Sequence, residues 1–513
     1  MDPVLLEDTS FDVIIYGTGL IETYLSGALS LAGKKVLHLE ENDYYGCSFA
    51  THSYSAFKDE IDNKINDPIQ VTTMETLPPN SKLLPLTQRP NLIKNGSYVH
   101  FEHQSTENDN GEEKDDSKIE SIEENLTKDS RRYNIDLHNN FLWCRGEDVE
   151  NMVQSGTHRY IEFHCVRQTL ISDNNGKLIS APVTKKDIFR SKDISLVEKR
   201  NLMRFVQTVM QNFDDNIETE EKLDVSKFES FKEFMVSQKL SDNLQSFILY
   251  IVCLCTSESE SNEMSVKEGM ERVKKYQQSS GVYGGSPFLY PLYGISEINQ
   301  GYSRLGAVNG SIYILKRSVQ SLVLDEESGK VKGVICNVGQ YLEAPCFVSS
   351  AKYFPNANSS VSASRCITIT NSSLVKDQEL IHIVKPPSDN LNTLFINQLD
   401  STTCVCPKGK YIVHFTTDSD KENPKEELET VVNTLLEETS NNVLFQSYFS
   451  LLGYDIDSEN LPNGVHIAPD YSFTKIGFER HLKEAERQFN QIVGEDYPFY
   501  PKRPDPYENV NSE

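Results

Sequence analysis

The residues of this chain that could do chemistry begin with a glycine turn near its start. Gly17 and Gly19 lie in the stretch Gly-Thr-Gly-Leu-Ile-Glu, between an apolar run and a helical pattern, where a dinucleotide-binding fingerprint is expected. The third fingerprint position, usually Gly or Ala, is Glu22. A carboxylate there takes the end of the helix dipole at which a phosphate would bind. Two such charges about 5 Å apart repel by roughly 3 kcal/mol, so the turn predicts a dinucleotide-type fold that binds no dinucleotide.

The elements that must position this turn form a β-α-β unit. Residues 11–16 and 36–39 are short apolar runs, typical of buried parallel strands. Between them an apolar stripe recurs at helical spacing: Ile21, Leu25, Ala28, Leu29 and Ala32. Glu40, at the end of the second strand, could bind a ribose, but residues 42–48 contain no arginine to neutralise a diphosphate. The sequence therefore indicates an α/β fold and no bound cofactor.

The composition excludes several classes of protein. The chain has 513 residues, enough for more than one domain, and its net charge of −26 argues against a nucleic-acid partner. No apolar run reaches the roughly 18 residues that a membrane span needs, and residues 1–10 do not resemble a signal peptide. The two Cys-x-Cys pairs, Cys253/Cys255 and Cys404/Cys406, favour packing over a zinc site. We predict no metal and a reducing, cytoplasmic location.

The middle of the chain is predicted to be helical. Ser195 with Glu198 and Ser230 with Glu233 are spaced as capping boxes, and residues 244–255 are apolar nearly all round, as in a buried helix. The acidic stretch 102–130 is expected to be a solvated insertion, with structure resuming at Tyr133. The predicted division is a first part of domain I at 1–187, a helical domain II at 188–280, the remainder of domain I at 281–495, and an irregular tail at 496–513.

A second dense cluster lies at 284–294, where aromatic residues and prolines follow one another closely. Exposed aromatic residues of this kind suit protein recognition. Glu297 and Arg304 follow it seven residues apart, on one face if the segment is helical. On spacing alone a surface salt bridge, worth about 0–1 kcal/mol, is the favoured interpretation of this pair. No serine nucleophile elbow, phosphate loop or paired-histidine motif occurs, so no catalytic residue is predicted.

Several of these segments resemble the Rab escort protein/Rab GDP-dissociation inhibitor superfamily. They occur in the family order and cover most of the chain outside the acidic insertion: residues 11–45, YNIDL at 133–137, RYIEF at 159–163, EKR at 198–200 and PFLYPLYG at 287–294. Residues 230–245 and 404–415 resemble the escort branch. The resemblance implies a flavin monooxygenase-like, FAD/NAD(P)-binding-like domain I that has lost its cofactor, and an inserted all-helical domain II.

The resemblance also implies roles for particular residues. Tyr45, Glu297 and Arg304 would form the Rab-binding platform of domain I, which overturns the salt-bridge interpretation of the last two. Phe231, expected to be an exposed aromatic at a helix start, would grip the α subunit of the geranylgeranyl transferase. Three departures from the family pattern affect fine contacts: Cys47 replaces a glycine, Ile298-Asn299 replaces Leu-Pro, and Asn309 replaces an aromatic residue or glycine.

The function implied is that of a non-catalytic escort. Such a protein binds newly made, GDP-bound Rab GTPases, presents them to the α/β heterodimer of Rab geranylgeranyl transferase, and shields the geranylgeranyl lipid, for which the helices around 244–255 are our candidate. It would be cytoplasmic with transient membrane association, and a nuclear pool is compatible with this. A Rab GDP-dissociation inhibitor is the alternative, and an FAD-dependent oxidoreductase is the alternative from another class.

Overall fold

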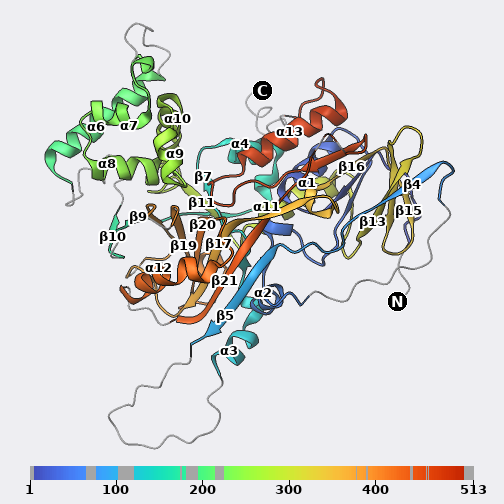
Figure 1. Ribbon diagram of the computed structural model, residues 1–513, viewed down its shortest axis with the longest axis horizontal. Helices are drawn as coiled ribbons and strands as arrows, with labels where there is room; N and C mark the ends of the chain where they lie inside the picture. The colour runs from blue at the N-terminus through green and yellow to red at the C-terminus, as the bar shows by residue number, and fades with distance from the viewer. Residues whose placement is uncertain are drawn as a thin grey trace, which may run out of the picture.

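Two bodies are visible in the computed structural model, a group of sheets and a helical unit that projects from one end of them (Figure 1). The chain is described over residues 5–64, 77–101, 121–173, 176–180, 194–213, 224–376, 378–388, 391–438, 443–457, 459 and 461–501. The described helices of the helical unit lie between residues 196 and 279, within the interval 188–280 that the sequence predicts. The boundary predicted at 188 lies outside the described residues.

The glycine turn belongs to a parallel five-stranded sheet. Its strands, in the order β12-β2-β1-β16-β22, are Ile312–Ile314, Val36–Leu39, Val13–Tyr16, Cys346–Ser350 and Val465–Ala468. Helix α1 (Leu20–Leu31) follows β1 across the turn, so the predicted β-α-β unit is confirmed. Helices α11 (Ser296–Val308) and α13 (Glu479–Val493) pack against α1 and complete this layer.

Among the described residues, three sheets are smaller than the parallel one. An antiparallel sheet has the order β15-β14-β13-β4, with bounds Tyr341–Glu343, Val331–Cys336, Val319–Asp325 and Ser81–Pro85. A three-stranded sheet has the order β7-β11-β8, with bounds Leu142–Trp143, Phe288–Pro291 and Phe163–Cys165. The short strands β3 (Thr51–His52) and β6 (Ile135–Asp136) pair with each other, Thr51 opposite Asp136. A 3-10 turn at Thr157–Arg159 precedes β8, whose extended backbone begins at Phe163.

The largest sheet has eight strands and was not predicted from the sequence. Its order is β10-β9-β18-β19-β20-β17-β21-β5. The bounds are Leu178–Ser180, Gln168–Ser172, Ile381–Lys385, Leu394–Asp400, Tyr411–Asp418, Asn358–Thr370, Val443–Asp455 and Ile93–His100. Helix α12 (Pro424–Glu438) packs against β17 and β21, where its apolar residues join a core of Val, Ile and Leu side chains.

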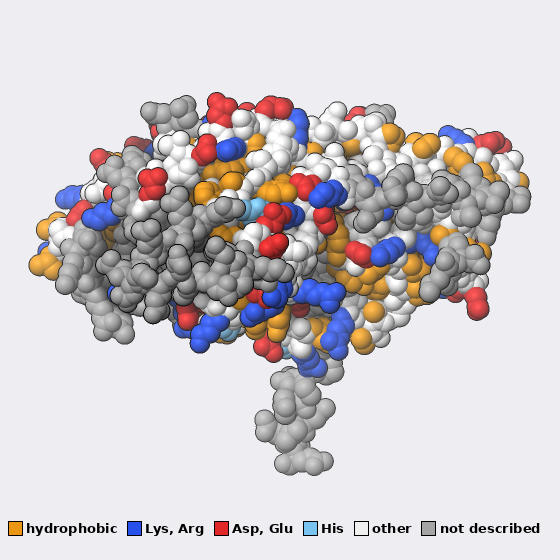
Figure 2. Space-filling model, turned by 90° about the horizontal axis from the view of Figure 1, so that it is seen from below, with side chains coloured by type: hydrophobic (Ala, Val, Ile, Leu, Met, Phe, Trp, Pro, Cys, Tyr) orange, Lys and Arg blue, Asp and Glu red, His pale blue; other side chains and the backbone are white. Residues whose placement is uncertain are grey.

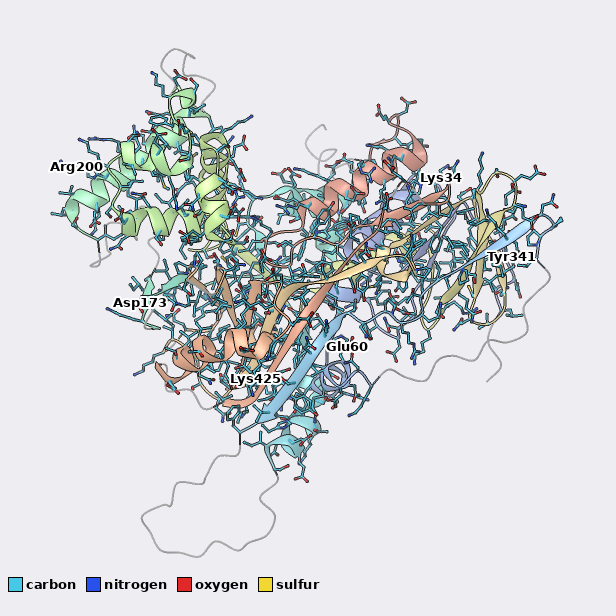
Figure 3. All side chains as sticks on the ribbon, viewed as in Figure 1. Lys34, Glu60, Asp173, Arg200, Tyr341 and Lys425 are labelled. Atoms are coloured by element: carbon cyan, nitrogen blue, oxygen red, sulfur yellow. The ribbon has the colours of Figure 1, made fainter. Side chains whose placement is uncertain are left out.

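The helical unit begins at the capping box that the sequence predicts, where Ser195 accepts the Glu198 N–H and Glu198 accepts the Ser195 N–H. Its helices are α6 (Leu196–Asn212), α7 (Phe231–Ser237), α8 (Asp242–Phe247), α9 (Glu258–Glu263) and α10 (Val266–Ser279), with a π-helical turn at Ile248–Val252. The predicted buried helix at 244–255 is thus α8 and this turn, and its apolar side chains are buried. Arg200 on α6 lies at the outer side of the unit, far from Lys425 on α12 (Figure 3).

Ion pairs join the helical unit to the rest of the molecule. Glu260 of α9 accepts hydrogen bonds from Arg272 of α10, at 2.7 Å, and from Lys475, outside the unit. Lys275 of α10 pairs with Glu479 at the start of α13. Burial alone would raise the pKa of Glu260, but hydrogen bonds from Lys475 and the Thr256 backbone, with the charge of Lys475, lower that pKa to about 2. Glu260 is therefore ionised at neutral pH and stabilises the junction.

The acidic stretch 102–130 is not wholly a solvated insertion. Residues 102–120 lie outside the described residues, but helix α3 (Ile122–Lys128) begins at a capping box between Ser121 and Glu124. Its Leu126 is buried, and Glu123 pairs with Lys58 on α2 (Tyr54–Ile61). Structure thus resumes before Tyr133, because one apolar side chain and an ion pair fix this short acidic helix to α2.

Helix α4 comprises Glu147–Ser155. Residues 496–501 form no helix or strand, and the rest of the tail predicted at 496–513 lies outside the described residues. Within the described part of the chain, no helix combines the length and the apolar character needed to cross a membrane. Seen from below, acidic and basic side chains are interspersed with hydrophobic ones, and Lys and Arg gather near the middle of this face (Figure 2). Basic side chains are thus concentrated around the middle of this face (Figure 2).

Candidate partner-binding platform

The carboxyl group of Glu22 lies against the glycine turn. A Cβ atom placed on Gly19 would be 2.5 Å from Oε2 of Glu22, and one placed on Gly17 would be 3.6 Å from Oε1. Burial, opposed by a hydrogen bond from its own backbone N–H, raises the pKa of Glu22 to about 7. The side chain is thus only partly ionised at neutral pH. Its carboxyl occupies the phosphate position, and the charge repulsion that the sequence suggested is reduced to the extent that this carboxyl is protonated.

The other polar groups of the turn are also engaged within the protein. Glu40, the candidate ribose ligand, accepts hydrogen bonds from the Thr18 hydroxyl at 2.7 Å and from the Asn42 side chain at 2.9 Å. The Thr18 carbonyl accepts a hydrogen bond from Asn299 of α11 at 2.9 Å. Cys47, in the left-handed region with φ 52°, places its Sγ 3.3 Å from the Thr18 N–H.

These residues do not fit a dinucleotide cofactor. The cavity beside the turn, lined by Glu22, Lys352 and Asp470 among others, has a volume of about 30 Å³, far below the roughly 300–1,000 Å³ of typical cofactor and ligand sites. The neighbouring cation is internal as well, since Lys352 is 4% exposed and its amino group lies 4.0 Å from the Glu41 carboxylate. A diphosphate would have to displace Glu22, and Glu40 would have to give up its present partners to bind a ribose.

The three residues predicted to form a platform lie together. Tyr45, Glu297 and Arg304 line one surface depression of about 310 Å³. Tyr160, Gln300 and Tyr313 also line it. We call these six residues the platform. Tyr45 comes from the loop after β2, Tyr160 from the segment before β8, Tyr313 from β12, and the other three from α11.

Glu297 and Arg304 do not pair with each other among the contacts of the described residues. The Arg304 guanidinium lies over the ring of Tyr160, 4.6 Å from its centroid, a cation–π contact. Glu297 accepts a hydrogen bond from Gln300 at 3.1 Å, and burial raises the pKa of its carboxyl. The salt-bridge interpretation is therefore wrong, and both charged groups remain available on one face of α11.

Small residues let the platform elements approach closely. A Cβ on Gly306 of α11 would lie 2.6 Å from the Tyr313 hydroxyl, which also hydrogen-bonds Ser26 of α1 at 2.7 Å. A Cβ on Gly301 would lie 2.7 Å from Ile161, next to Tyr160. Glycine at these positions allows α11 to lie between β12 and the loop that carries Tyr160. Tyr160 and Tyr313 were not predicted from the sequence as platform residues, although the RYIEF segment contains Tyr160.

Phe231 is not exposed, contrary to the expectation for a transferase contact. Its side chain is 0% exposed, and its ring packs against Gly269 of α10, where an added Cβ would lie 2.3 Å away. Phe205 and Phe234 lie beside it with ring centroids 6.2 and 6.1 Å away. The first residue of α7 faces the core of the helical unit because the apolar stripes of α6, α7 and α10 converge there. The exposed apolar residue on α7 is Val236, at 60%.

A family model described as "GDP dissociation inhibitor" matches residues 7–70 and 112–503. The chain belongs to the GDP dissociation inhibitor family. A similar protein from Drosophila melanogaster is named Rab proteins geranylgeranyltransferase component A. It is 29% identical over 515 residues, which cover 98% of this chain and 91% of that protein. The family resemblance read from the sequence is therefore confirmed.

Solved structures support the fold. A Rab GDI from Plasmodium falciparum superposes with a TM-score of 0.70 at 23% identity, covering 97% of this chain and 100% of that one. An oxidoreductase from Methanosarcina mazei superposes with a TM-score of 0.52 at 14% identity, covering 93% and 100%. The fold is thus that of the family and is related to oxidoreductases, as predicted.

The burial of Glu22 predicts a pH-dependent stability difference between the wild type and Glu22→Gln. The folded pKa of about 7 exceeds the ordinary value of 4.5, so the contribution of Glu22 to stability is full below pH 4.5 and is lost as the pH rises through 7. The wild type should lose about 3 kcal/mol relative to the variant over this interval. Denaturant unfolding of both proteins at several pH values measures this difference in unfolding free energy. The contributions of the other carboxyl groups are the same in both proteins and cancel in the difference. A constant difference would contradict the assignment.

Proposed function

We propose that this protein is a Rab escort protein. It binds newly made, GDP-bound Rab GTPases through the platform and presents their C-terminal cysteines to Rab geranylgeranyl transferase. The observation that carries the proposal is that Tyr45, which lies far from Glu297 and Arg304 in the sequence, lines the same depression as these two residues of α11. The name of the Drosophila relative, matched over nearly its full length, supports the transferase partner.

In this role the protein is a non-catalytic accessory subunit. Its α/β domain uses a cofactor-type scaffold as a binding surface, since the dinucleotide turn is filled by Glu22. A Rab GDP-dissociation inhibitor, which handles Rabs that are already prenylated, is the second candidate because the family model carries that description. An FAD-dependent oxidoreductase is disfavoured by the small cavity at the turn.

After prenylation the lipid must be kept from water, because a 20-carbon chain left exposed costs on the order of 10 kcal/mol or more. We propose the helical unit as the element that shields it. The apolar residues of α8 and the π-helical turn are buried as the structure stands, for example Phe247 at 8% and Ile251 at 0%. Lipid binding would therefore require the helices to separate. The protein would act in the cytoplasm and deliver lipidated Rab to membranes.

A reconstituted reaction tests the proposal. Unmodified GDP-loaded Rab, the transferase and geranylgeranyl diphosphate are incubated with and without this protein, and lipid transfer is followed by mass. We expect transfer to require the protein. Arg304→Ala should weaken Rab binding by about 2 kcal/mol, roughly 30-fold, because Arg304 is a preorganised, exposed anchor.

The matched control is Arg487→Ala, which removes an exposed arginine from α13, outside the platform. It should bind Rab as the wild type does. If the protein binds prenylated Rab yet fails to support transfer to unmodified Rab, it is an inhibitor and the escort proposal is wrong. Equal Rab affinity in the Arg304→Ala and wild-type proteins would remove the platform from the proposal.

We also propose that the transferase docks on α7, the helix that Phe231 begins. Phe231→Ala would open a cavity and is expected to lower the unfolding free energy by about 3–5 kcal/mol, so it cannot test docking cleanly. Val236→Asp changes an exposed side chain and should leave the melting temperature unchanged while weakening the complex with transferase. Analytical ultracentrifugation of the complex measures this, and wild-type affinity would exclude the exposed face of α7.

A further inference from the structure

The carboxylate of Asp136 joins three chain segments, those of Thr51, of residues 136–139 and of residues 290–295. It is 0% exposed and lies on the short strand β6. Its Oδ1 accepts hydrogen bonds from the Thr51 hydroxyl at 2.6 Å and from the Ile295 N–H at 3.0 Å. Its Oδ2 accepts from the Tyr290 hydroxyl at 2.6 Å and from Asn139 at 2.9 Å. Four donors thus converge on one buried acceptor.

Two of these donors belong to segments that carry the platform. Ile295 immediately precedes α11. Ser296, the first residue of α11, donates its N–H to the Thr51 hydroxyl at 3.2 Å. Asp136 and Thr51 together therefore satisfy two backbone N–H groups at the start of α11, where a negative charge also suits the helix dipole. Thr51 lies six positions after Tyr45 on the same chain segment. Asp136 thus ties the Tyr45 side of the depression to the α11 side.

The backbone of the preceding loop is shaped for this contact. Gly294 has φ 113°, a conformation that favours glycine. A Cβ atom there would lie 2.7 Å from Oδ1 of Asp136 and 2.5 Å from Oγ1 of Thr51. Only a residue without a side chain lets the carboxylate reach the helix start, which explains why the turn PLYG ends in glycine.

The same carboxylate is linked to the large sheet. Asn139 accepts a hydrogen bond from Asn397 of β19 at 2.8 Å, and Asn397 hydrogen-bonds His382 of β18 at 2.7 Å. Tyr290 lies on β11, between β7 and β8. These buried contacts therefore fix the start of α11 relative to two sheets. The orientation of the helix is thus set by buried contacts and not by the residues on its exposed face.

We propose that Asp136 is a positioning residue for the platform: it orients α11 so that Glu297 and Arg304 face the partner together with Tyr45. This inference rests on the proposed function. An asparagine at this position keeps the shape but has one acceptor oxygen, so its amide nitrogen would face either the Thr51 and Ile295 donors or the Tyr290 and Asn139 donors. One side of the junction would lose its acceptor.

Asp136→Asn is tested against Asp148→Asn. Asp148 is also buried and accepts the Phe478 N–H at 2.7 Å, beside the start of α13, a helix that carries no platform residue. Both proteins are assayed with GDP-loaded Rab by titration calorimetry at a temperature where circular dichroism shows them folded. We expect Asp136→Asn to weaken Rab binding by about fivefold or more, the size of a lost helix cap, and Asp148→Asn to leave it unchanged.

A second comparison separates positioning from general destabilisation. Thr51→Ser keeps the hydroxyl that bridges Asp136 and Ser296 and should bind Rab as the wild type does, whereas Thr51→Val should weaken binding. In the double variant Asp136→Asn/Arg304→Ala, the losses should be less than additive, because Asp136 acts through α11.

The outcomes distinguish this inference from the proposed function. Equal losses in Asp136→Asn and Asp148→Asn, or strictly additive losses in the double variant, would overturn the positioning role. If Arg304→Ala weakens binding and Asp136→Asn does not, the positioning role alone fails. If neither variant changes Rab binding, the platform itself fails, and the positioning role fails with it.

Discussion

The structure depends on one side chain that has taken the place of a ligand. Glu22 lies over the glycine turn, its carboxyl 2.5 Å from where a Cβ of Gly19 would be. Once that position is filled from within, the strand-turn-helix unit no longer has to leave room for a diphosphate. Asn299 can then donate to the Thr18 carbonyl, and α11 can pack directly on the turn. The closed site thus supports the helix that carries Glu297 and Arg304.

The platform is assembled from segments that need rigid support, because its own surface contacts are few. Arg304 makes a cation–π contact with Tyr160, and Glu297 accepts a hydrogen bond from Gln300. Both are interactions of modest energy. The positions of the platform residues are fixed by buried contacts below the surface. Glycines of α11 allow Tyr313 and Ile161 to lie close to this helix, and Asp136 accepts a hydrogen bond at its start. A surface built in this way can present fixed polar groups to a family of related partners.

The parts of the fold that depend on local sequence patterns could be predicted from the sequence. The apolar runs flanking Gly17 and the capping residue Ser195 are local signals, and the structure confirms both. The eight-stranded sheet was missed because long strands such as β17 mix Ser and Thr with apolar residues, and its pairing joins segments far apart in the chain. The predicted exposure of Phe231 was wrong because a position at the start of a helix does not determine whether the side chain faces the core. Tyr160 and Asp136 lie in recognisable segments, but their roles depend on tertiary contacts.

Flavin binding is the measurement that tests the central claim most directly. The purified protein is titrated into FAD, and the fluorescence anisotropy of the flavin is followed with a flavin-binding oxidoreductase of the same fold as positive control. Because Glu22 fills the turn and the remaining cavity of about 30 Å³ is far smaller than a cofactor site, we predict no saturable change in anisotropy. Saturable binding of one FAD per chain would contradict the claim that this scaffold has exchanged its cofactor site for a partner-binding face.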